Sequence, residues 1–180
     1  MTAPRPSAFR SFGRLAVLVP PVRVEAPECV VVGDGVVVHE HAWLCVQPRP
    51  GQPAPLLTLG DRTSINRFAK IVCHASVTIG ADCIFSDRVY ISDVEHVPAA
   101  DGPPVLTPPR PVVLEDGVFL GIGAVIKPGV TIGAGSYIGA SAVVTDDVPP
   151  HSLAAGAPAV VIRTRGADGA WEPVRAAGGA

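Results

Sequence analysis

The sequence predicts an all-β chain folded as a parallel β-helix of hexapeptide repeats, with one long loop excursion and a C-terminal cap. Three observations support this prediction. Large aliphatic residues recur at every sixth position, small or β-branched residues form a second six-residue series, and glycine or polar residues stand between them. A period of six fits neither an α-helix, with about 3.6 residues per turn, nor hairpins with turns roughly every 8–12 residues. It is typical of stacked coils in which each hexad is one short strand and a corner.

The longest uninterrupted run of hexads covers residues 114–148. Its large positions are Leu114, Leu120, Ile126, Ile132, Ile138 and Val144. Its small positions are Val118, Ala124, Val130, Ser136, Ala142 and Val148. Both series are expected to point into one continuous apolar column. A narrow column accepts branched aliphatics more readily than rings, which fits a chain with 48% hydrophobic and only 5% aromatic residues.

The same pattern recurs upstream in shorter runs. Three series of large residues lie six apart: Val32, Val38 and Leu44; Leu59, Ile65, Ile71 and Val77; and, after a shift of two positions, Ile79, Phe85 and Ile91. Val36 and Ala42 occupy the small positions of the first series. The β-helix domain is therefore predicted to span residues 30–148.

The segments outside the repeat define the rest of the organisation. Residues 1–29 carry no recognised hexads and are expected to form an irregular N-terminal lead-in. Residues 149–165 are expected to cover the open end of the column as a cap, and the Gly/Ala-rich tail 166–180 to be disordered. Proline-rich loops interrupt the repeat at 47–55 and 92–111. The second is the longest break, and long loops in compact repeats usually carry function.

Composition limits the partners and the compartment. Charges nearly cancel, with 14 basic and 16 acidic residues, which argues against a nucleic-acid partner because that partner requires a basic face. No stretch is long enough to span a membrane, and the apolar segment 15–19 is too short for a signal peptide, so a cytoplasmic location is expected. No Cys-x-x-Cys pair occurs, so the cysteines are predicted to be buried thiols, with no metal site: Cys29, Cys45, Cys73 and Cys83.

One histidine stands out among the five in the chain. His39, His41, His74 and His151 lie in hexad corners or near the cap, where a solvated or structural histidine is the simpler interpretation. His96 lies in the long loop beside Glu95, and a histidine near neutral pH is suited to general-base chemistry. Asp93 or Glu95 could orient its ring. The residues alone leave a catalytic and a structural His96 equally open.

The last part of the chain resembles a known family. Residues 143–163 read V-V-T-D-D-V-P-P-H-S-L-A-A-G-A-P-A-V-V-I-R, an ending similar to that of hexapeptide-repeat acetyltransferases of the galactoside, maltose and polysaccharide O-acetyltransferase branch. The resemblance covers about Val30 to Arg163. It implies a left-handed β-helix, a homotrimer with active sites between subunits, and acetyl-CoA as the acyl donor.

The resemblance also implies roles for individual residues. The segment Ile91-Ser92-Asp93-Val94-Glu95-His96 is similar to the I-S-D-H-x-H of the polysaccharide branch, which makes His96 the catalytic base. Asn66 matches an acceptor-binding asparagine of the galactoside branch, although an asparagine at a tight corner is an equally open interpretation. Asp93 and Glu95, next to the base, complete the predicted acceptor-binding set.

A second group of residues is implied to bind the CoA donor. The resemblance places five residues along the last coils: Phe119, Gly121, Ala140, Thr145 and Arg163. Arg163 would lie near the nucleotide phosphates, which suit a guanidinium group. Asp146 and Val160 stand where the family usually has basic residues, so Lys127 or Arg165 could substitute for the lost positive charge.

The predicted function is therefore transfer of an acyl group, by default acetyl, from CoA to a hydroxyl of a sugar or other small acceptor. Three alternatives stay open: N-acylation of an amino sugar, a metal hydratase of the γ-carbonic-anhydrase type, and a scaffold without catalysis. The hydratase needs a three-histidine site between subunits, which the histidine spacing does not support. The sequence does not name the acceptor.

Overall fold

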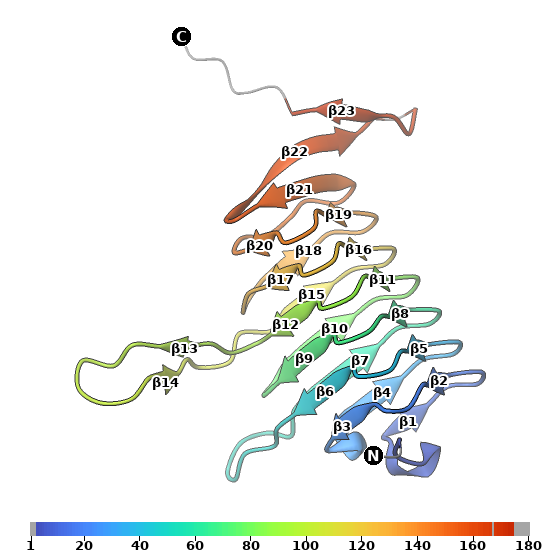
Figure 1. Ribbon diagram of the computed structural model, residues 1–180, viewed down its shortest axis with the longest axis vertical. Coiled ribbons are helices and arrows are strands. Elements are labelled where there is room, and N and C mark those ends of the chain that lie inside the picture. The colour runs from blue at the N-terminus through green and yellow to red at the C-terminus, as the bar shows by residue number, and fades with distance from the viewer. Residues whose placement is uncertain (1–2, 167, 175–180) are drawn as a thin grey trace.

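The computed structural model describes residues 3–166 and 168–174, which consist almost entirely of short strands (Figure 1). No α-helix occurs in these residues, and the two 3-10 helices are η1 (Pro6–Ala8) and η2 (Pro27–Cys29). Three sheets, named A, B and C, run side by side along one column, and the chain passes from A to B to C in every coil. A small antiparallel hairpin of β13 (His96–Val97) and β14 (Val105–Leu106) projects sideways from this column.

The strands follow each sheet in a regular order. Sheet A contains β1 (Ser11–Phe12), β4 (Val30–Val32), β7 (Leu56–Leu59), β10 (Ser76–Ile79), β15 (Val112–Leu114) and β18 (Thr131–Ile132). Sheet B contains β2 (Val17–Leu18), β5 (Val37–Val38), β8 (Ser64–Ile65), β11 (Ile84–Phe85), β16 (Phe119–Leu120), β19 (Tyr137–Ile138), β21 (Ser152–Gly156), β22 (Ala159–Arg165) and β23 (Trp171–Pro173). Sheet C contains β3 (Arg23–Glu25), β6 (Trp43–Val46), β9 (Lys70–Cys73), β12 (Tyr90–Ser92), β17 (Val125–Ile126) and β20 (Val143–Val144).

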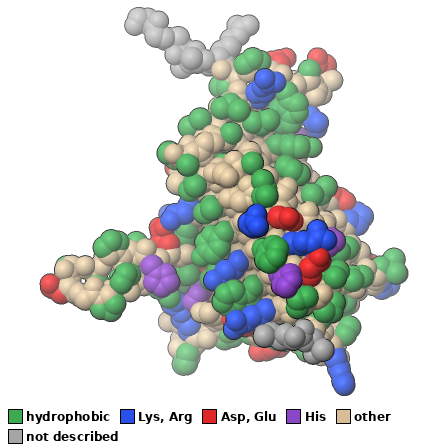
Figure 2. Space-filling model, in the orientation of Figure 1, with side chains coloured by type: hydrophobic (Ala, Val, Ile, Leu, Met, Phe, Trp, Pro, Cys, Tyr) green, Lys and Arg blue, Asp and Glu red, His purple; other side chains and the backbone are tan. Residues whose placement is uncertain are grey.

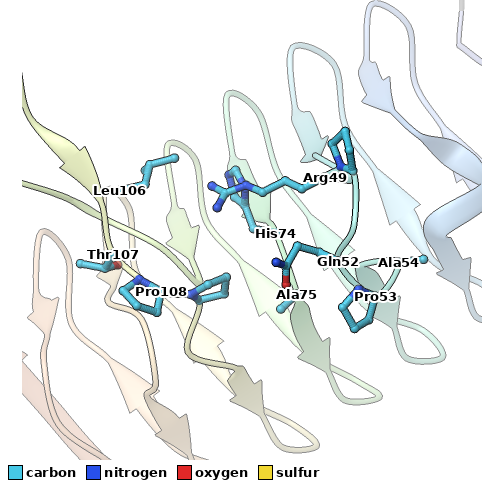
Figure 3. A pocket seen from close by; sticks show the side chains of 11 residues that line it. Arg49, Gln52, Pro53, Ala54, His74, Ala75, Leu106, Thr107 and Pro108 are labelled. Carbon is cyan, nitrogen blue, oxygen red and sulfur yellow. The ribbon is translucent and has the colours of Figure 1, made fainter.

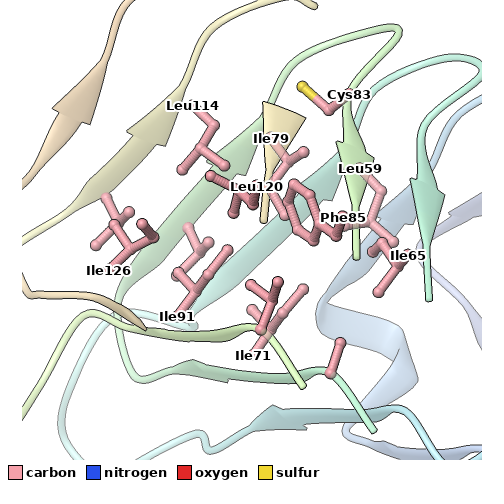
Figure 4. Packing of buried hydrophobic residues seen from close by; sticks show 14 of the residues in the cluster. Leu59, Ile65, Ile71, Ile79, Cys83, Phe85, Ile91, Leu114, Leu120 and Ile126 are labelled. Atoms are coloured by element: carbon pink, nitrogen blue, oxygen red, sulfur yellow. The ribbon is translucent and has the colours of Figure 1, made fainter. Parts of the chain in front are cut away.

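The strand register confirms the predicted repeat. The large aliphatic positions stack on one another in sheet A as Val32, Leu59, Ile79, Leu114 and Ile132. They stack in sheet B as Val38, Ile65, Phe85, Leu120 and Ile138, and in sheet C as Leu44, Ile71, Ile91, Ile126 and Val144. All are buried, and Figure 4 shows those of the middle coils, such as Ile65, Phe85 and Leu120, packed together at the centre of the column. The predicted small positions and all four cysteines are buried as well.

Nearly all variation in coil length falls at one corner of the column, where sheet C passes to sheet A. In the last coils Val113 pairs with Thr131, 18 positions further on, whereas Lys70 pairs with Tyr90, 20 positions further on. The added residues lie at 26–29, 47–55, 74–75 and 93–111, each of which joins a strand of sheet C to the next strand of sheet A. Both predicted loops therefore leave the column from the same corner, two coils apart.

The structure corrects the predicted N-terminal lead-in. Residues 11–25 were expected to be irregular, but they form the first coil, in which β1, β2 and β3 pair parallel with β4, β5 and β6. Phe12, Leu18 and Val24 lie six apart and pack against the core. The step of eight positions from Val24 to Val32 obscured this hexad in the sequence.

The cap extends sheet B beyond the last coil (Figure 1). Strand β21 pairs parallel with β19, and β22 then turns back antiparallel to β21. Ala159 and Val161 pack against the end of the core, as expected of a cap. The predicted disordered tail contains β23, which pairs with β22, so this part of the prediction is wrong. Residue 167 and residues 175–180 of that tail lie outside the described residues.

Replacing Gly60 with alanine is expected to destabilise the fold by about 3 kcal/mol, the upper end of the range for overpacking. Gly60 lies where sheet A passes to sheet B, and a Cβ there would come 2.4 Å from the carbonyl carbon of Gly80 and 2.5 Å from the nitrogen of Ala81. Both neighbours are backbone atoms, which cannot move aside. Urea unfolding at fixed protein concentration measures the loss. The control is Gly51→Ala, where the backbone φ is positive but nothing lies within 4 Å; an equal loss there would contradict the steric explanation.

Candidate active site

The outer face of sheet C forms the floor of the candidate site. Arg23 pairs with Trp43, Trp43 with Lys70, and Lys70 with Tyr90, so these four side chains stand in one row across four coils. Side chains alternate between the two faces of a strand, so the next outward row, two positions along, contains Glu25, Cys45, Val72 and Ser92. Trp43 and Tyr90 pack on Cys45 and Val72. This floor is therefore part aromatic and part cationic.

The projecting hairpin places His96 above this floor. His96 pairs with Leu106, and at the neck of the hairpin Thr107 N–H donates to the carbonyl oxygen of Glu95 (2.8 Å) while Glu95 N–H donates to Thr107 Oγ1 (3.1 Å). The His96 side chain is exposed, and histidine side chains are visible where the hairpin leaves the body (Figure 2). A hollow of about 230 Å³, here called the central hollow, is lined by Trp43, Cys45, Gln47, Lys70, Val72, His74, Tyr90, Ser92, Val94, His96 and Leu106.

A second hollow adjoins the first. It has a volume of about 540 Å³ and lies between the 47–55 loop and the neck of the hairpin; we call it the loop hollow. Arg49 and Pro53 line one side, and Leu106 and Pro108 line the other (Figure 3). His74 and Leu106 line both hollows, so the two hollows adjoin at these side chains.

Asp93 does not face either hollow. Its carboxylate is fully buried and accepts hydrogen bonds from the backbone N–H groups of His74 (2.9 Å), Ala75 (2.7 Å) and Ser76 (3.0 Å). Its own carbonyl oxygen accepts from Arg110 N–H (2.8 Å), at the far end of the long loop. Asp93 thus fixes both ends of the loop to the preceding coil. The sequence analysis placed it in the acceptor-binding set, and its burial gives that prediction no support.

Glu95 forms an ion pair with Lys127 from the end of β17. The pairing ties the hairpin to the column, and it occupies the lysine that the sequence analysis offered as a substitute phosphate contact. In the described part of the chain no carboxylate forms an ion pair with His96. The backbone of the hairpin neck, and not Asp93 or Glu95, therefore sets the position of the imidazole.

His74 was treated in the sequence analysis as a corner histidine, but it lies at the centre of the site. It is 7% exposed, and burial lowers the pKa of its imidazole, with the positive charge of Arg49 acting in the same direction and Asp93 opposing it. Its Nδ1 atom has no hydrogen-bond partner among the residues that the structure describes. His74 is therefore a neutral, buried group beside His96 at neutral pH.

This lowered pKa predicts that the protein loses stability as pH falls below 6.5, the ordinary pKa of the group. The unfolded chain binds a proton on residue 74 before the folded chain does, so acid favours unfolding. We expect the wild type to lose more unfolding free energy between about pH 7 and pH 5 than the His74→Gln variant, since histidine titrates in this range. Urea unfolding at both pH values measures the difference. His151→Gln, at an exposed position, is the control; equal pH dependence in wild type and His74→Gln would contradict the prediction.

Cys45 brings a thiol to the central hollow but not a nucleophile. Its sulfur donates to Glu25 Oε2 (3.3 Å) and accepts from Gln47 Nε2 (3.2 Å). Burial, together with the adjacent Glu25 carboxylate, raises the pKa of Cys45 to about 11. The thiol is therefore protonated at neutral pH, whereas covalent catalysis by cysteine needs the thiolate.

Asn66 lies away from His96 within one copy of the chain. It follows β8 and precedes β9, and its backbone N–H donates to the carbonyl oxygen of Phe85 (3.2 Å). His96 instead follows β12. Because the strands of sheet C are parallel, Asn66 lies where they begin and His96 lies beyond where they end. The structure does not bring these two predicted residues together.

The structure brings three of the five predicted donor-binding residues together. Phe119, Gly121 and Ala140 line a hollow of about 350 Å³ on the outer face of sheet B, here called the sheet B hollow. The ring of Phe119 stacks on Tyr137, with 5.3 Å between centroids. A Cβ on Gly121 would come 2.6 Å from the nitrogen of Ala140, so the glycine is required by the close approach of two coils.

Thr145 and Arg163 lie outside the sheet B hollow. Thr145 follows β20 at the end of sheet C and donates to Asp146 Oδ2 (2.7 Å). Arg163 is exposed on β22, where it pairs with Leu153, a residue that lines the sheet B hollow. Arg163 therefore lies next to the predicted donor site, and Thr145 lies on a different side of the column.

Comparison with known proteins identifies the family. Residues 111–146 match the family described as bacterial transferase hexapeptide (six repeats). The chain is 33% identical over 153 residues to galactoside O-acetyltransferase of Escherichia coli K12, a match that covers 79% of this chain and 70% of that protein. The chain belongs to the hexapeptide-repeat acetyltransferase family.

Solved structures agree with this assignment. The crystal structure of galactoside acetyltransferase in complex with coenzyme A is 27% identical, with a TM-score of 0.61, and covers 88% of this chain and 66% of that one. A variant of AntD, an N-acyltransferase from Bacillus cereus, is 18% identical, with a TM-score of 0.79 over 90% of this chain and 87% of that one, and shows the fold alone. This hexapeptide-repeat acetyltransferase is therefore a left-handed β-helix, as the resemblance implied.

Other relatives match over a smaller share of their length. The chain spans 60% of an O-acetyl transferase of lipopolysaccharide biosynthesis from Escherichia coli K12, at 30% identity over 118 residues. It spans 26% of an acetyltransferase of Schizosaccharomyces pombe, at 57% identity over 53 residues.

The described residues contain neither a metal-binding cluster nor a membrane-spanning helix. Within residues 3–166 and 168–174, no three histidine, cysteine, aspartate or glutamate side chains gather closely enough to hold a metal ion. No helix in the same residues is long and apolar enough to cross a bilayer. The cytoplasmic location expected from the sequence stays a prediction.

The sequence analysis missed most of the residues around His96. Trp43, Lys70 and Tyr90 each precede a large hexad position, Leu44, Ile71 and Ile91 respectively. Those three large positions stack in sheet C, so their preceding neighbours must stand side by side on its outer face. The repeat in the sequence was therefore sufficient to predict that these three side chains form a row. Arg49 carried no such signal, because its position depends on the path of the 47–55 loop.

Proposed function

We propose that the chain transfers an acyl group, by default acetyl, from CoA to a hydroxyl of a sugar or another small acceptor. The observation that carries the proposal is the exposed His96 at the rim of the central hollow, in a chain that is 33% identical to galactoside O-acetyltransferase. A histidine with free access to a hollow can accept a proton from a bound hydroxyl. The proposal assigns the acceptor to this hollow.

The proposed donor site is the sheet B hollow. A relative of known structure is bound to coenzyme A, and the narrow, apolar floor of Phe119, Gly121 and Ala140 suits a pantetheine arm. Arg163 and Arg165 are exposed on the adjacent β22, so their guanidinium groups are available to the nucleotide phosphates. Lys127 is engaged by Glu95, and the proposal does not assign it to the donor.

In the proposed mechanism, His96 removes the proton from the acceptor hydroxyl as its oxygen attacks the thioester carbonyl carbon. A backbone N–H of the last coils stabilises the negative charge that develops on the carbonyl oxygen. The carbon–sulfur bond then breaks, and His96 passes its proton to the CoA thiolate. Transfer is direct, because the Cys45 thiol is protonated and offers no nucleophile for a covalent intermediate.

We further propose that the functional unit is a homotrimer. The sheet B hollow and the central hollow lie on different faces of one column, so a neighbouring copy is needed to bring donor and base together. The same arrangement would bring Asn66 of the partner subunit to the acceptor. Sedimentation of the wild-type protein tests the stoichiometry.

The test of the proposed activity is release of free thiol from acetyl-CoA. Methyl galactoside, glucosamine and a reaction without acceptor are compared, with the acetylated product identified by mass spectrometry. Release that depends on methyl galactoside and yields an O-acetyl sugar is the expected result. Product on the glucosamine nitrogen alone would make an amine, and not a hydroxyl, the acceptor group. The absence of release with these sugars and with the anionic sugars named below would favour the scaffold alternative.

A further inference from the structure

The side chains that line the central and loop hollows carry positive charge and no negative charge. Their ionisable residues are Lys70, Arg49, Cys45, Tyr90, His74 and His96, and neither lining contains an aspartate or a glutamate. The whole chain has a net charge of −2, so the charge of the side chains that line the hollows is opposite in sign to that of the chain as a whole. Positive charge concentrated in a hollow favours an anionic ligand.

The two cations are also not neutralised by nearby carboxylates. The Lys70 ammonium lies 4.0 Å from the centre of the Trp43 ring, and neither Lys70 nor Arg49 forms an ion pair with the described residues. By contrast, Arg23 in the same row pairs with Glu25, and Lys127 pairs with Glu95. Arg23 and Lys127 are thus neutralised by carboxylates of the protein, whereas Lys70 and Arg49 are available to bind an anionic ligand.

Two buried polar atoms of residues that line the central hollow support the same conclusion. Trp43 Nε1 and His74 Nδ1 are the buried side-chain nitrogen or oxygen atoms that lack a hydrogen-bond partner in the described part of the chain. Both residues line the central hollow, and His74 is 7% exposed. The indole N–H is only a donor, so its complement is an acceptor oxygen. Native proteins rarely leave such groups unpaired, so each calls for an explanation.

We infer that the acceptor carries an oxyanion, a carboxylate or a phosphate, bound by Lys70 and Arg49 with its hydroxyl presented to His96. An oxyanion supplies several acceptor oxygens at once, which suits the Lys70 ammonium and the Arg49 guanidinium. Arg49 reaches the site from the 47–55 loop and lies beside His74 across from Leu106 (Figure 3). The inference rests on the proposed function for the assignment of the hollow to the acceptor, and it narrows the substrate class from sugars in general to anionic ones.

A binding experiment tests the anionic site without any turnover. The chain has two tryptophans, so in a Trp171→Phe background the fluorescence reports on Trp43 alone. The probes are glucuronate, glucose 6-phosphate and glucose, and the first two separate a carboxylate site from a phosphate site. We expect a saturable change with at least one anionic sugar, binding at least about tenfold tighter than glucose, because hydrogen bonds to charged groups are worth that much.

Variants at Lys70 test whether this cation causes the tighter binding of the anionic sugar. Lys70→Met should weaken the anionic sugar by about tenfold or more and leave glucose unchanged, and Lys70→Arg should restore most of the affinity. Arg14→Gln, at an exposed ion pair in the first coil, is the control and should change nothing. Circular dichroism shows whether each variant is folded.

The outcomes separate the inference from the proposed function. Equal binding of glucose and the anionic sugars, no response to any sugar, or no effect of Lys70→Met would overturn the anionic site. A Trp43 response to CoA alone would also overturn it, since the cations would then serve the donor phosphates. Thiol release with a neutral acceptor would leave the proposed function standing in each of these cases. Acylation of an anionic acceptor with a KM raised at least about tenfold by Lys70→Met, at nearly unchanged kcat, would support both.

Discussion

Replacing His96 with alanine is expected to lower kcat for acyl transfer by about 10²–10⁴-fold, the usual contribution of a general base. The imidazole is exposed at the rim of the central hollow, and no carboxylate in the described residues competes for its position. The KM for acetyl-CoA should change little, because the sheet B hollow that we assign to the donor lies on another face of the column. Steady-state thiol release over a range of both substrates measures the two parameters.

The control for this variant is another histidine of similar exposure. His151 lies at the start of the cap, away from both hollows, and His151→Ala should retain wild-type kcat. Unfolding free energies of both variants exclude a general loss of structure. If His96→Ala kept more than half of the wild-type kcat, the base would lie elsewhere, and His74, which lines the same hollow, would be the next residue to test.

The interior of this fold could be predicted almost completely from the sequence, because every coil repeats one constraint. A position such as Ile65 or Leu120 must be large and apolar to fill the same layer of the column, and six-residue spacing reveals it. The first coil escaped detection only because an eight-residue step separates Val24 from Val32. Where a corner gains two residues, the period breaks although the packing continues.

The site was harder to predict because it depends on how coils stack and not on the repeat itself. Trp43 meets Lys70 across 27 positions, and Lys70 meets Tyr90 across 20, and these offsets follow from the loop lengths at one corner. The local sequence around His96 suggested that Asp93 and Glu95 serve the imidazole. In the structure one is used by three backbone N–H groups and the other by Lys127, contacts that only the folded arrangement of the corner reveals.

Asp93 gives the second large effect: Asp93→Ala is expected to cost about 3 kcal/mol or more of unfolding free energy, since each buried donor left without a partner costs about 1–3 kcal/mol. The side chain is 0% exposed and satisfies the N–H groups of three consecutive residues, His74, Ala75 and Ser76. Its loss would also release the start of the long loop that carries His96. Urea unfolding, at one protein concentration because assembly affects apparent stability, measures the change.

Two further substitutions separate anchoring from acceptor binding. In Asp93→Asn the amide oxygen can still accept hydrogen bonds, and in the wild type the N–H groups of Ala75 and Ser76 both donate to one oxygen, Oδ2. The variant should therefore lose only about 1 kcal/mol of unfolding free energy, the contribution of one hydrogen bond. Asp101→Ala, exposed on the same loop excursion, should lose less than about 0.5 kcal/mol. If Asp93→Ala kept its stability and instead raised the KM for the acceptor, the acceptor-binding role expected from the sequence would be right. A loss of stability with an unchanged KM in Asp93→Asn would assign the carboxylate to the architecture that holds His96 over the central hollow.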